Sequence, residues 1–220
     1  MKKICFCFSL LMFALLLSIG PGMSMSAQAG PNPVVIFETS MGRFIVMLYP
    51  KDAPKTVKNF LRYVDEGFYN GTVFHRVVRK EDFERQITAR KEYPYAMIQG
   101  GGLTPDLKKK DTYSPIVNES ATGLLNKKGT IAMARGGHPD SATAQFFINT
   151  IDNAAFDYKQ TAKKYNQKEF NTRQGYCAFG KVIRGMDVVE KISMVKRKKV
   201  GQRKNVPVKP VVILKAYRAK

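Results

Sequence analysis

Short runs of apolar and β-branched residues, separated by turn residues, recur through most of the chain. Runs of this length and composition predict β-strands. Val34–Thr39 and Arg43–Tyr49 flank the turn Ser40-Met41-Gly42, so these two strands are expected to form a hairpin. The same pattern predicts six further strands, at Thr72–Val78, Ala96–Gln99, Gly129–Met133, Gln145–Asn149, Cys177–Val182 and Pro210–Ala216.

Two segments have helical features instead. The first begins at Pro54 and ends at Gly67, and its apolar residues recur at i, i+3, i+4 and i+7. The second is Met186–Ser193, in which Asp187 and Glu190 have the spacing of a capping box. Eight short strands with two helices predict a mainly β fold, a single closed barrel with the helices packed outside.

Two polar stretches interrupt this pattern. Arg79–Tyr93 and Tyr158–Gly175 are charged and weakly periodic, so we expect loop insertions near residues 79–95 and 158–175. Long loops on a barrel either contact substrate or are tolerated decoration, and the sequence leaves both roles open.

The first 29 residues differ from the rest. Lys2 and Lys3 precede an apolar run from Ile4 to Ile19, and Ala27-Gln28-Ala29 supplies small residues. This order predicts a signal peptide over residues 1–29, cleaved near Ala29, and one domain over residues 30–220. The alternative is an uncleaved membrane anchor, but the apolar run is shorter than the roughly 20 residues that a spanning helix needs.

Cleavage at this point would leave Cys177 as the one cysteine of the exported chain, which excludes an internal disulfide. A lone Cys beside Tyr176 and Phe179 is expected to pack as an apolar side chain. Without Lys2 and Lys3 the chain has 35 basic and 17 acidic residues, a net charge of +18. This charge allows anionic envelope surfaces as partners, although solvated faces explain most basic runs.

Several kinds of catalytic site are poorly supported. His75 and His138 are the two histidines of the chain, too few for a predicted zinc site, and we expect no metal. Gly100-Gly101-Gly102 lacks the Lys and Ser/Thr of a phosphate-binding loop. The residues therefore give little support to hydrolysis, metal chemistry or phosphoryl transfer.

Five other runs follow one another in a specific order, namely Val73–Val77, Met97–Gly101, Gly129–Arg135, Ser141–Ile148 and Phe179–Val189. Together they resemble the cyclophilin family of peptidyl-prolyl cis–trans isomerases, from about Val34 to the end of the chain. The resemblance implies an eight-stranded antiparallel barrel capped by two helices, and an isomerase that needs no cofactor. Residues 205–214 resemble bacterial exported members, which implies a periplasmic location, or secretion.

The resemblance also assigns site residues. Arg76 matches the catalytic arginine of the family, and Gln99 matches its substrate-binding glutamine. Phe147 and Met97 match the proline pocket, although core packing is a serious alternative for both. Ala134 and Arg135 match positions that run alongside substrate.

The chain departs from the animal-type pattern at four pocket positions. Ala96 and Ala155 stand where aromatic residues are usual, Phe156 replaces Leu, and Tyr176 replaces His. We expect Phe156 and Tyr176 to supply part of the lost ring surface.

Three functions therefore compete. The leading one is isomerisation of Xaa-Pro bonds in proline-containing, unfolded or flexible exported polypeptides by a monomer. The second is a cyclophilin-fold chaperone that binds peptides with little isomerase activity, motivated by Ala96 and Ala155. A nucleic-acid ligand ranks last, because export argues against it, and it would require strongly salt-dependent binding.

Overall fold

The β1–β2 hairpin is the first element of the fold. In this computed structural model the described residues are 30–84, 95–158 and 175–219. β1 (Val34–Thr39) pairs antiparallel with β2 (Gly42–Leu48), from Val34 opposite Met47 to Thr39 opposite Gly42. Gly42 has a φ of +124°, and a Cβ there would lie 2.9 Å from Cγ2 of Val188. The predicted hairpin is confirmed, and a glycine is needed at residue 42, where the turn ends and β2 begins.

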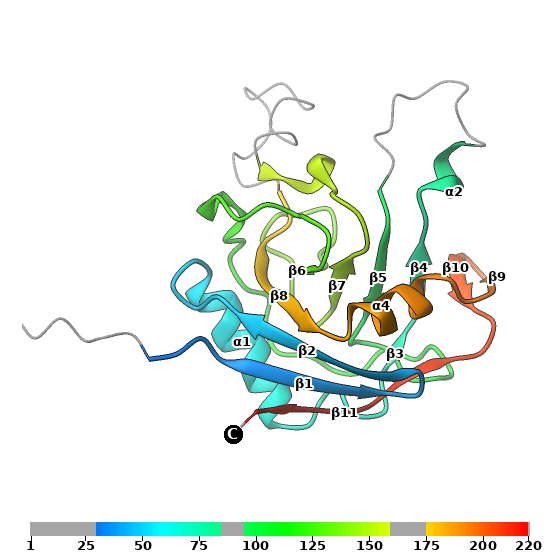
Figure 1. Ribbon diagram of the computed structural model, residues 1–220, viewed down its shortest axis with the longest axis horizontal. Helices are drawn as coiled ribbons and strands as arrows, with labels where there is room; N and C mark the ends of the chain where they lie inside the picture. The colour runs from blue at the N-terminus through cyan, green and yellow to red at the C-terminus, as the bar shows by residue number, and fades with distance from the viewer. Residues whose placement is uncertain (1–29, 85–94, 159–174, 220) are drawn as a thin grey trace, which may run out of the picture. The chain divides into compact units, whose positions relative to one another are not determined.

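Nine strands form the main sheet, in the order β3-β11-β1-β2-β8-β6-β7-β5-β4 (Figure 1). The two ends of this order, β3 and β4, are consecutive in the chain with His75 between them, so the sheet curls into a nearly closed barrel. The single strand predicted at Thr72–Val78 is therefore two strands, and counted as one they give the predicted eight. The other strands of the sheet are β3 (Val73–Phe74), β4 (Arg76–Val78), β5 (Met97–Gly100), β6 (Thr130–Met133), β7 (Phe146–Asn149), β8 (Ala178–Arg184) and β11 (Val211–Arg218).

Helix α1 (Pro54–Asp65) buries the apolar face that its periodicity predicts, including Phe60 and Val64. Its first turn is not capped by its own N-terminal residue. The carboxylate of Glu119 instead accepts hydrogen bonds from the backbone N–H of Lys55 (3.1 Å) and Thr56 (2.7 Å). A negative charge at this end also complements the helix dipole.

Helix α4 (Met186–Ser193) is confirmed, but its predicted capping box is wrong. The helix starts after Gly185 without a side-chain cap. Asp187 pairs with Lys191 at 3.3 Å and Glu190 with Lys128 at 2.7 Å, so both carboxylates bind exposed lysines rather than backbone N–H groups.

The two predicted insertions lie partly outside the described residues, which exclude 85–94 and 159–174. Within the first, α2 (Glu81–Glu84) adds a turn of helix where a loop was expected. Two short 3₁₀ helices, η1 (Ser120–Thr122) and η2 (Ala154–Phe156), lie in connections between strands.

A second, two-stranded sheet was not predicted. β9 (Arg197–Val200) and β10 (Arg203–Pro207) form an antiparallel ribbon with a register shift between Arg203 and Val206. Asn205 has a left-handed φ of +61° at this irregularity. The charged run that begins at Lys196 had indicated only a solvated face, because its basic residues hide the strand pattern.

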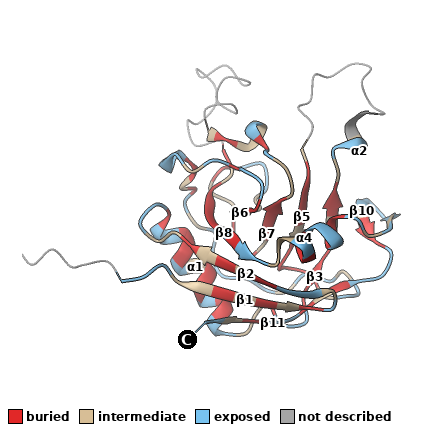
Figure 2. Cartoon of the chain, viewed as in Figure 1, coloured by how far each residue is buried: buried red, intermediate tan, exposed pale blue. Residues whose placement is uncertain are grey.

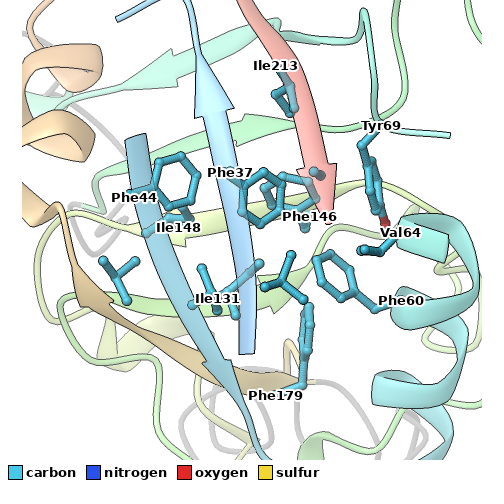
Figure 3. Packing of buried hydrophobic residues seen from close by; sticks show 14 of the residues in the cluster. Phe37, Phe44, Phe60, Val64, Tyr69, Ile131, Phe146, Ile148, Phe179 and Ile213 are labelled. Atoms are coloured by element: carbon cyan, nitrogen blue, oxygen red, sulfur yellow. The ribbon is translucent and has the colours of Figure 1, made fainter. Parts of the chain in front are cut away.

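Buried residues recur along the strands of the barrel (Figure 2). Aromatic and aliphatic side chains fill its interior (Figure 3). Phe37 stacks on Phe44 with ring centroids 4.8 Å apart, and Phe60 lies 5.0 Å from Phe179. Phe60 and Val64 reach this interior from α1 (Figure 3). Close packing of the interior keeps the strands of the barrel rigid. The side chains on the outer face of these strands are therefore held in place.

The compact unit that contains all of these elements spans Asn32–Lys220. No helix within the described residues is both long enough and apolar enough to span a bilayer.

Candidate active site

Three predicted site residues lie in one row across neighbouring strands. Arg76 of β4 is paired with Gln99 of β5, and Gln99 is paired with Phe147 of β7. Directly paired residues in a sheet project to the same face. The antiparallel register therefore places Arg76, Gln99 and Phe147 side by side, although they are far apart in the sequence.

Side-chain alternation separates this face from the barrel interior. Val77, Ile98 and Phe146 belong to the main core, whereas Val78, Met97 and Phe147 belong to a second cluster. Because successive residues of a strand point to opposite faces, each site strand contributes to both clusters. We refer to this second cluster, with the half-buried side chains packed on it, as the outer cluster.

Four aromatic rings pack together in the outer cluster. Phe147 is 2% exposed, and its ring contacts Phe156 (centroids 5.4 Å apart) and Tyr176 (5.5 Å). Phe156 also contacts Tyr176 (4.8 Å) and Tyr95 (4.9 Å). The expectation that Phe156 and Tyr176 supply ring surface agrees with this packing, and Met97 and Ala134 lie in the same cluster.

Polar groups border the outer cluster on the β4 side. The guanidinium of Arg76 donates hydrogen bonds to Oε1 of Gln99 (3.3 Å) and to the hydroxyl of Tyr95 (2.7 Å). Gln99 in turn donates from Nε2 to Oε1 of Gln145 (3.0 Å). These bonds fix the plane of the guanidinium and the orientation of the Gln99 amide.

On the opposite side, Arg135 lies over Tyr176 with its guanidinium carbon 4.7 Å from the ring centroid. Its Nε donates to the carbonyl of Gly175 (3.3 Å). The backbone N–H of Ala134, the residue after β6, donates to the carbonyl of Gln145 (2.9 Å), so this segment runs beside the cluster. All eight predicted site residues thus lie in or next to the outer cluster.

Sequence reasoning missed Tyr95 and Gln145. Ala96 had been identified as the position that lacks a usual aromatic residue, yet the ring comes from the preceding residue, Tyr95. An aromatic residue next to the Met97-Ile98-Gln99 run was a usable signal, although its contact with Arg76 depends on the fold.

A buried amide explains how Ala96 and the η2 segment are fixed. The backbone N–H of Ala96 donates to Oδ1 of Asn153 (3.0 Å), and Nδ2 of Asn153 donates back to the Ala96 carbonyl (2.8 Å). Asn153 also donates to Asn149 of β7 (2.6 Å). Because Asn153 directly precedes η2, these bonds hold Phe156 against the cluster.

A pocket of about 500 Å³ opens beside Arg76 and Gln99. It extends from Tyr95 and Gln145 to the β9–β10 ribbon and is mostly polar in its side chains. Its other lining residues are His75, Val78, Asp82, Gln202, Arg203, Lys204 and Asn205.

Two buried titratable groups lie near the site or the core. Burial lowers the pKa of His75 to about 4, with the nearby charges of Arg203 and Arg76 acting in the same direction, so this histidine is neutral at pH 7. Burial raises the pKa of the Cys177 thiol to about 12, which keeps it protonated. Both observations agree with structural roles, and His138 is exposed.

No group of three or more His, Cys, Asp or Glu side chains within residues 30–84, 95–158 and 175–219 is arranged to hold a metal ion. The site offers the fixed guanidinium of Arg76, the amides of Gln99 and Gln145, and the apolar surface of the outer cluster. Such a set can bind and polarise a planar amide group.

Comparison with known proteins identifies the family. Residues 34–218 match the family model described as cyclophilin type peptidyl-prolyl cis-trans isomerase/CLD. The chain belongs to the cyclophilin family. It is accordingly a peptidyl-prolyl cis–trans isomerase.

Bacterial cyclophilins are among its similar relatives. The chain is 46% identical over 182 residues to peptidyl-prolyl cis-trans isomerase A of Dickeya dadantii, which covers 83% of this chain and 82% of that protein. It is 42% identical over 180 residues to peptidyl-prolyl cis-trans isomerase B of Escherichia coli, covering 82% and 96%. Most of the chain therefore corresponds to these enzymes.

Solved cyclophilin structures share the fold. A cyclophilin type peptidyl-prolyl cis-trans isomerase of Cryptosporidium parvum aligns with a TM-score of 0.65 at 21% identity, over 86% of this chain and 98% of that chain. A second structure of that protein, in the presence of the dipeptide Ala-Pro, has a TM-score of 0.64 at 21% identity, over 85% and 99%. These likenesses confirm the predicted cyclophilin fold, an antiparallel barrel with two helices, which in this chain is nearly closed.

Proposed function

We propose that Arg76 is the principal catalytic residue of this isomerase and that Gln99 orients the substrate. The observation that carries the proposal is the row of Arg76, Gln99 and Phe147 on one face of β4, β5 and β7. It puts a charged donor, an amide and an apolar surface side by side on one face of the sheet.

The chemistry requires little beyond these groups. Rotation about an Xaa-Pro bond breaks amide resonance and has a barrier of about 20 kcal/mol. Acceleration to an enzymatic rate requires a reduction of roughly 5.5–7 kcal/mol. In the twisted state the prolyl nitrogen regains its lone pair, and a guanidinium donor binds that state better than either planar state.

The contacts of Arg76 support this role. Tyr95 and Gln99 each accept one bond from the guanidinium, and an arginine has five N–H donors, so others can reach a substrate. Because the guanidinium is oriented in advance, little reorganisation is needed when the bond twists.

In this proposal the outer cluster receives the proline ring. Phe147 and Met97 form its buried floor, 2% and 3% exposed, and the half-buried rings of Phe156 and Tyr176 form its rim. The proline ring enters as these rim rings shift, and Ala134 and Arg135 bind the adjoining substrate backbone. The Cryptosporidium relative studied with Ala-Pro makes this dipeptide sequence a suitable probe.

The test is cis–trans exchange of an Ala-Pro peptide, followed by NMR exchange spectroscopy, with the wild type, Arg76→Ala and Arg184→Ala. Arg184 is exposed on β8, so its variant removes the same charge away from the site. We expect Arg76→Ala to reduce kcat/KM ten-fold or more, about 1.4 kcal/mol, and Arg184→Ala to have little effect. Equal acceleration by wild type and Arg76→Ala would refute the role of Arg76, whereas peptide binding without acceleration by either protein would favour a peptide-binding chaperone.

We also propose that residues 1–29 are a signal peptide and that the substrates are exported, proline-containing polypeptides. The charge and apolar pattern of this segment supports the proposal, as does a family match that begins at residue 34. Mass spectrometry of the protein from cell envelope fractions should find Gly30 as the first residue. An intact chain in the cytoplasmic fraction would contradict export.

A further inference from the structure

The β9–β10 ribbon brings a dense positive charge to one end of the active site. Its five cationic side chains come from two short strands, and β10 lies against β4, the strand of Arg76. Its basic residues are Arg197, Lys198, Lys199, Arg203 and Lys204. Neither the family resemblance nor the mechanism above gives these residues a task.

The pocket beside Arg76 has an unbalanced charge. Arg76, Arg203 and Lys204 line it, and the one carboxylate among its described lining residues is Asp82. That carboxylate is already paired, because Arg197 donates to it at 2.5 Å and the backbone N–H of Arg79 at 2.9 Å. Three cations therefore face the pocket without a matching anion among its described lining residues.

The lowered pKa of His75, next to the pocket, agrees with this positive electrostatic field. Burial is the main cause that lowers the pKa of His75, and the charges of Arg203 and Arg76 lower it further. Both guanidinium groups therefore act on the same point, where β3 passes into β4. A carboxylate that entered the pocket would be stabilised by the same field.

The position of the pocket relative to the proline site predicts its place along a substrate. From β7, which holds Phe147, the sheet continues through β5 to β4, and the ribbon lies beyond. Neighbouring strands are about 4.8 Å apart, so the ribbon begins roughly 10 Å or more from Phe147. An extended peptide advances about 3.3 Å per residue, so a side chain about two to four residues from the proline reaches the pocket.

We propose that this pocket is a specificity subsite that binds an Asp or Glu side chain of the substrate, and that Arg203 and Lys204 select it. The enzyme would thus prefer Xaa-Pro bonds with an acidic residue about two to four positions away. This inference rests on the proposed placement of proline at Phe147, and it adds the class of sequence that the enzyme prefers.

The experiment compares peptides with Glu or Gln scanned over four positions on each side of one Ala-Pro bond. For each peptide we would measure kcat/KM by NMR exchange and Kd by fluorescence anisotropy. At one or two positions on one side, wild type should prefer Glu over Gln by roughly three- to ten-fold in low salt. The preference should shrink in 0.5 M NaCl, since salt screens exposed charges.

A matched pair of variants separates the pocket from the overall charge. R203Q/K204Q removes two charges that line the pocket, whereas K199Q/K209Q removes two exposed charges that do not. The Glu:Gln ratio should fall to near one in the first variant and remain in the second.

Three results would overturn the proposal, namely no Glu preference in wild type, a preference retained by R203Q/K204Q, or an equal loss in both variants. The last would assign the effect to the net charge of the protein. Failure of the proposed catalysis is a different result, because neutral peptides would then exchange equally fast with wild type and Arg76→Ala. The Kd measurements still test the subsite in that case.

Discussion

Phe146 and Phe147 are consecutive residues of β7, yet their rings belong to two different regions. Phe146 lies inside the barrel, where its ring contacts Phe37 (5.4 Å) and Phe60 (5.8 Å). Phe147 lies in the outer cluster against the half-buried Phe156 and Tyr176. The barrel interior encloses its rings on all sides, whereas the outer cluster has a rim of half-buried aromatic rings and a polar border.

This difference separates stability from function. Enclosed rings gain the full benefit of burial and close packing, and their loss leaves a cavity that the rigid barrel cannot fill. Rings at the rim of the outer cluster can shift, so the same region can admit a substrate. Arg76 and Gln99 can border the second region because it is open to water on that side.

The largest expected effect comes from the barrel interior. Phe146→Ala should lower the free energy of unfolding by about 3–5 kcal/mol, because it leaves a cavity among aromatic rings. Urea unfolding followed by circular dichroism measures this change. The KM for an Ala-Pro peptide should change little at temperatures where the variant is folded, and a large rise in KM with normal stability would break the distinction between the two regions.

His75 tests the boundary between the two regions, since it separates Phe74 in the core from Arg76 at the site. Its pKa is about 4 in the folded chain and about 6.5 when unfolded, so its contribution to stability is complete above pH 6.5 and declines as the pH falls towards 4. Between pH 7.5 and 4.5 this loss should be roughly 2–3 kcal/mol.

Urea unfolding at both pH values checks this expectation in the wild type, His75→Gln and His138→Gln. The first variant should show a smaller pH-dependent loss than the wild type. His138 is exposed, so its variant should keep the wild-type loss. If His75→Gln also kept the whole loss, other groups would be responsible for it.

The outer cluster should show the opposite pattern. Phe147→Ala should raise KM for an Ala-Pro peptide about ten-fold, roughly 1.4 kcal/mol, because the proline ring loses its floor. Its cost in stability should be smaller than that of Phe146→Ala, since Phe156 and Tyr176 can move into the space. Kinetics and urea unfolding of Phe146→Ala and Phe147→Ala, measured in parallel, test this expectation. Equal losses of stability would show that the outer cluster is part of the structural core.

Tyr95→Phe should have the smallest effect and acts on the border of the outer cluster. It keeps the ring that packs on Phe156 and removes the hydroxyl that accepts a bond from Arg76. We expect kcat to fall roughly three- to ten-fold with little change in KM, because Tyr95 orients the guanidinium that we propose to be catalytic. Tyr95→Ala should raise KM as well, and a Tyr95→Phe variant with normal kcat would show that the bond does not position Arg76.

Much of the fold could be predicted because its signals are local. All eight predicted strands have counterparts close to the expected residues, one of them divided into β3 and β4, and so do both helices. The β9–β10 ribbon could not be predicted, because Arg197–Lys199 are basic and lack an apolar alternation. The capping box failed since nearby lysines compete for Asp187 and Glu190.

The sequence by itself determined which residues alternate, where helices form and which runs resemble a cyclophilin, because these depend on neighbours along the chain. The tertiary structure alone decided that Arg76, Gln99 and Phe147 share one row, that Tyr95 holds Arg76, and that Glu119 caps a helix 63 residues away. Strand order, register and the closure of the barrel set those contacts. They depend on which distant strands pair, and that choice minimises the free energy of the whole barrel rather than of any one segment.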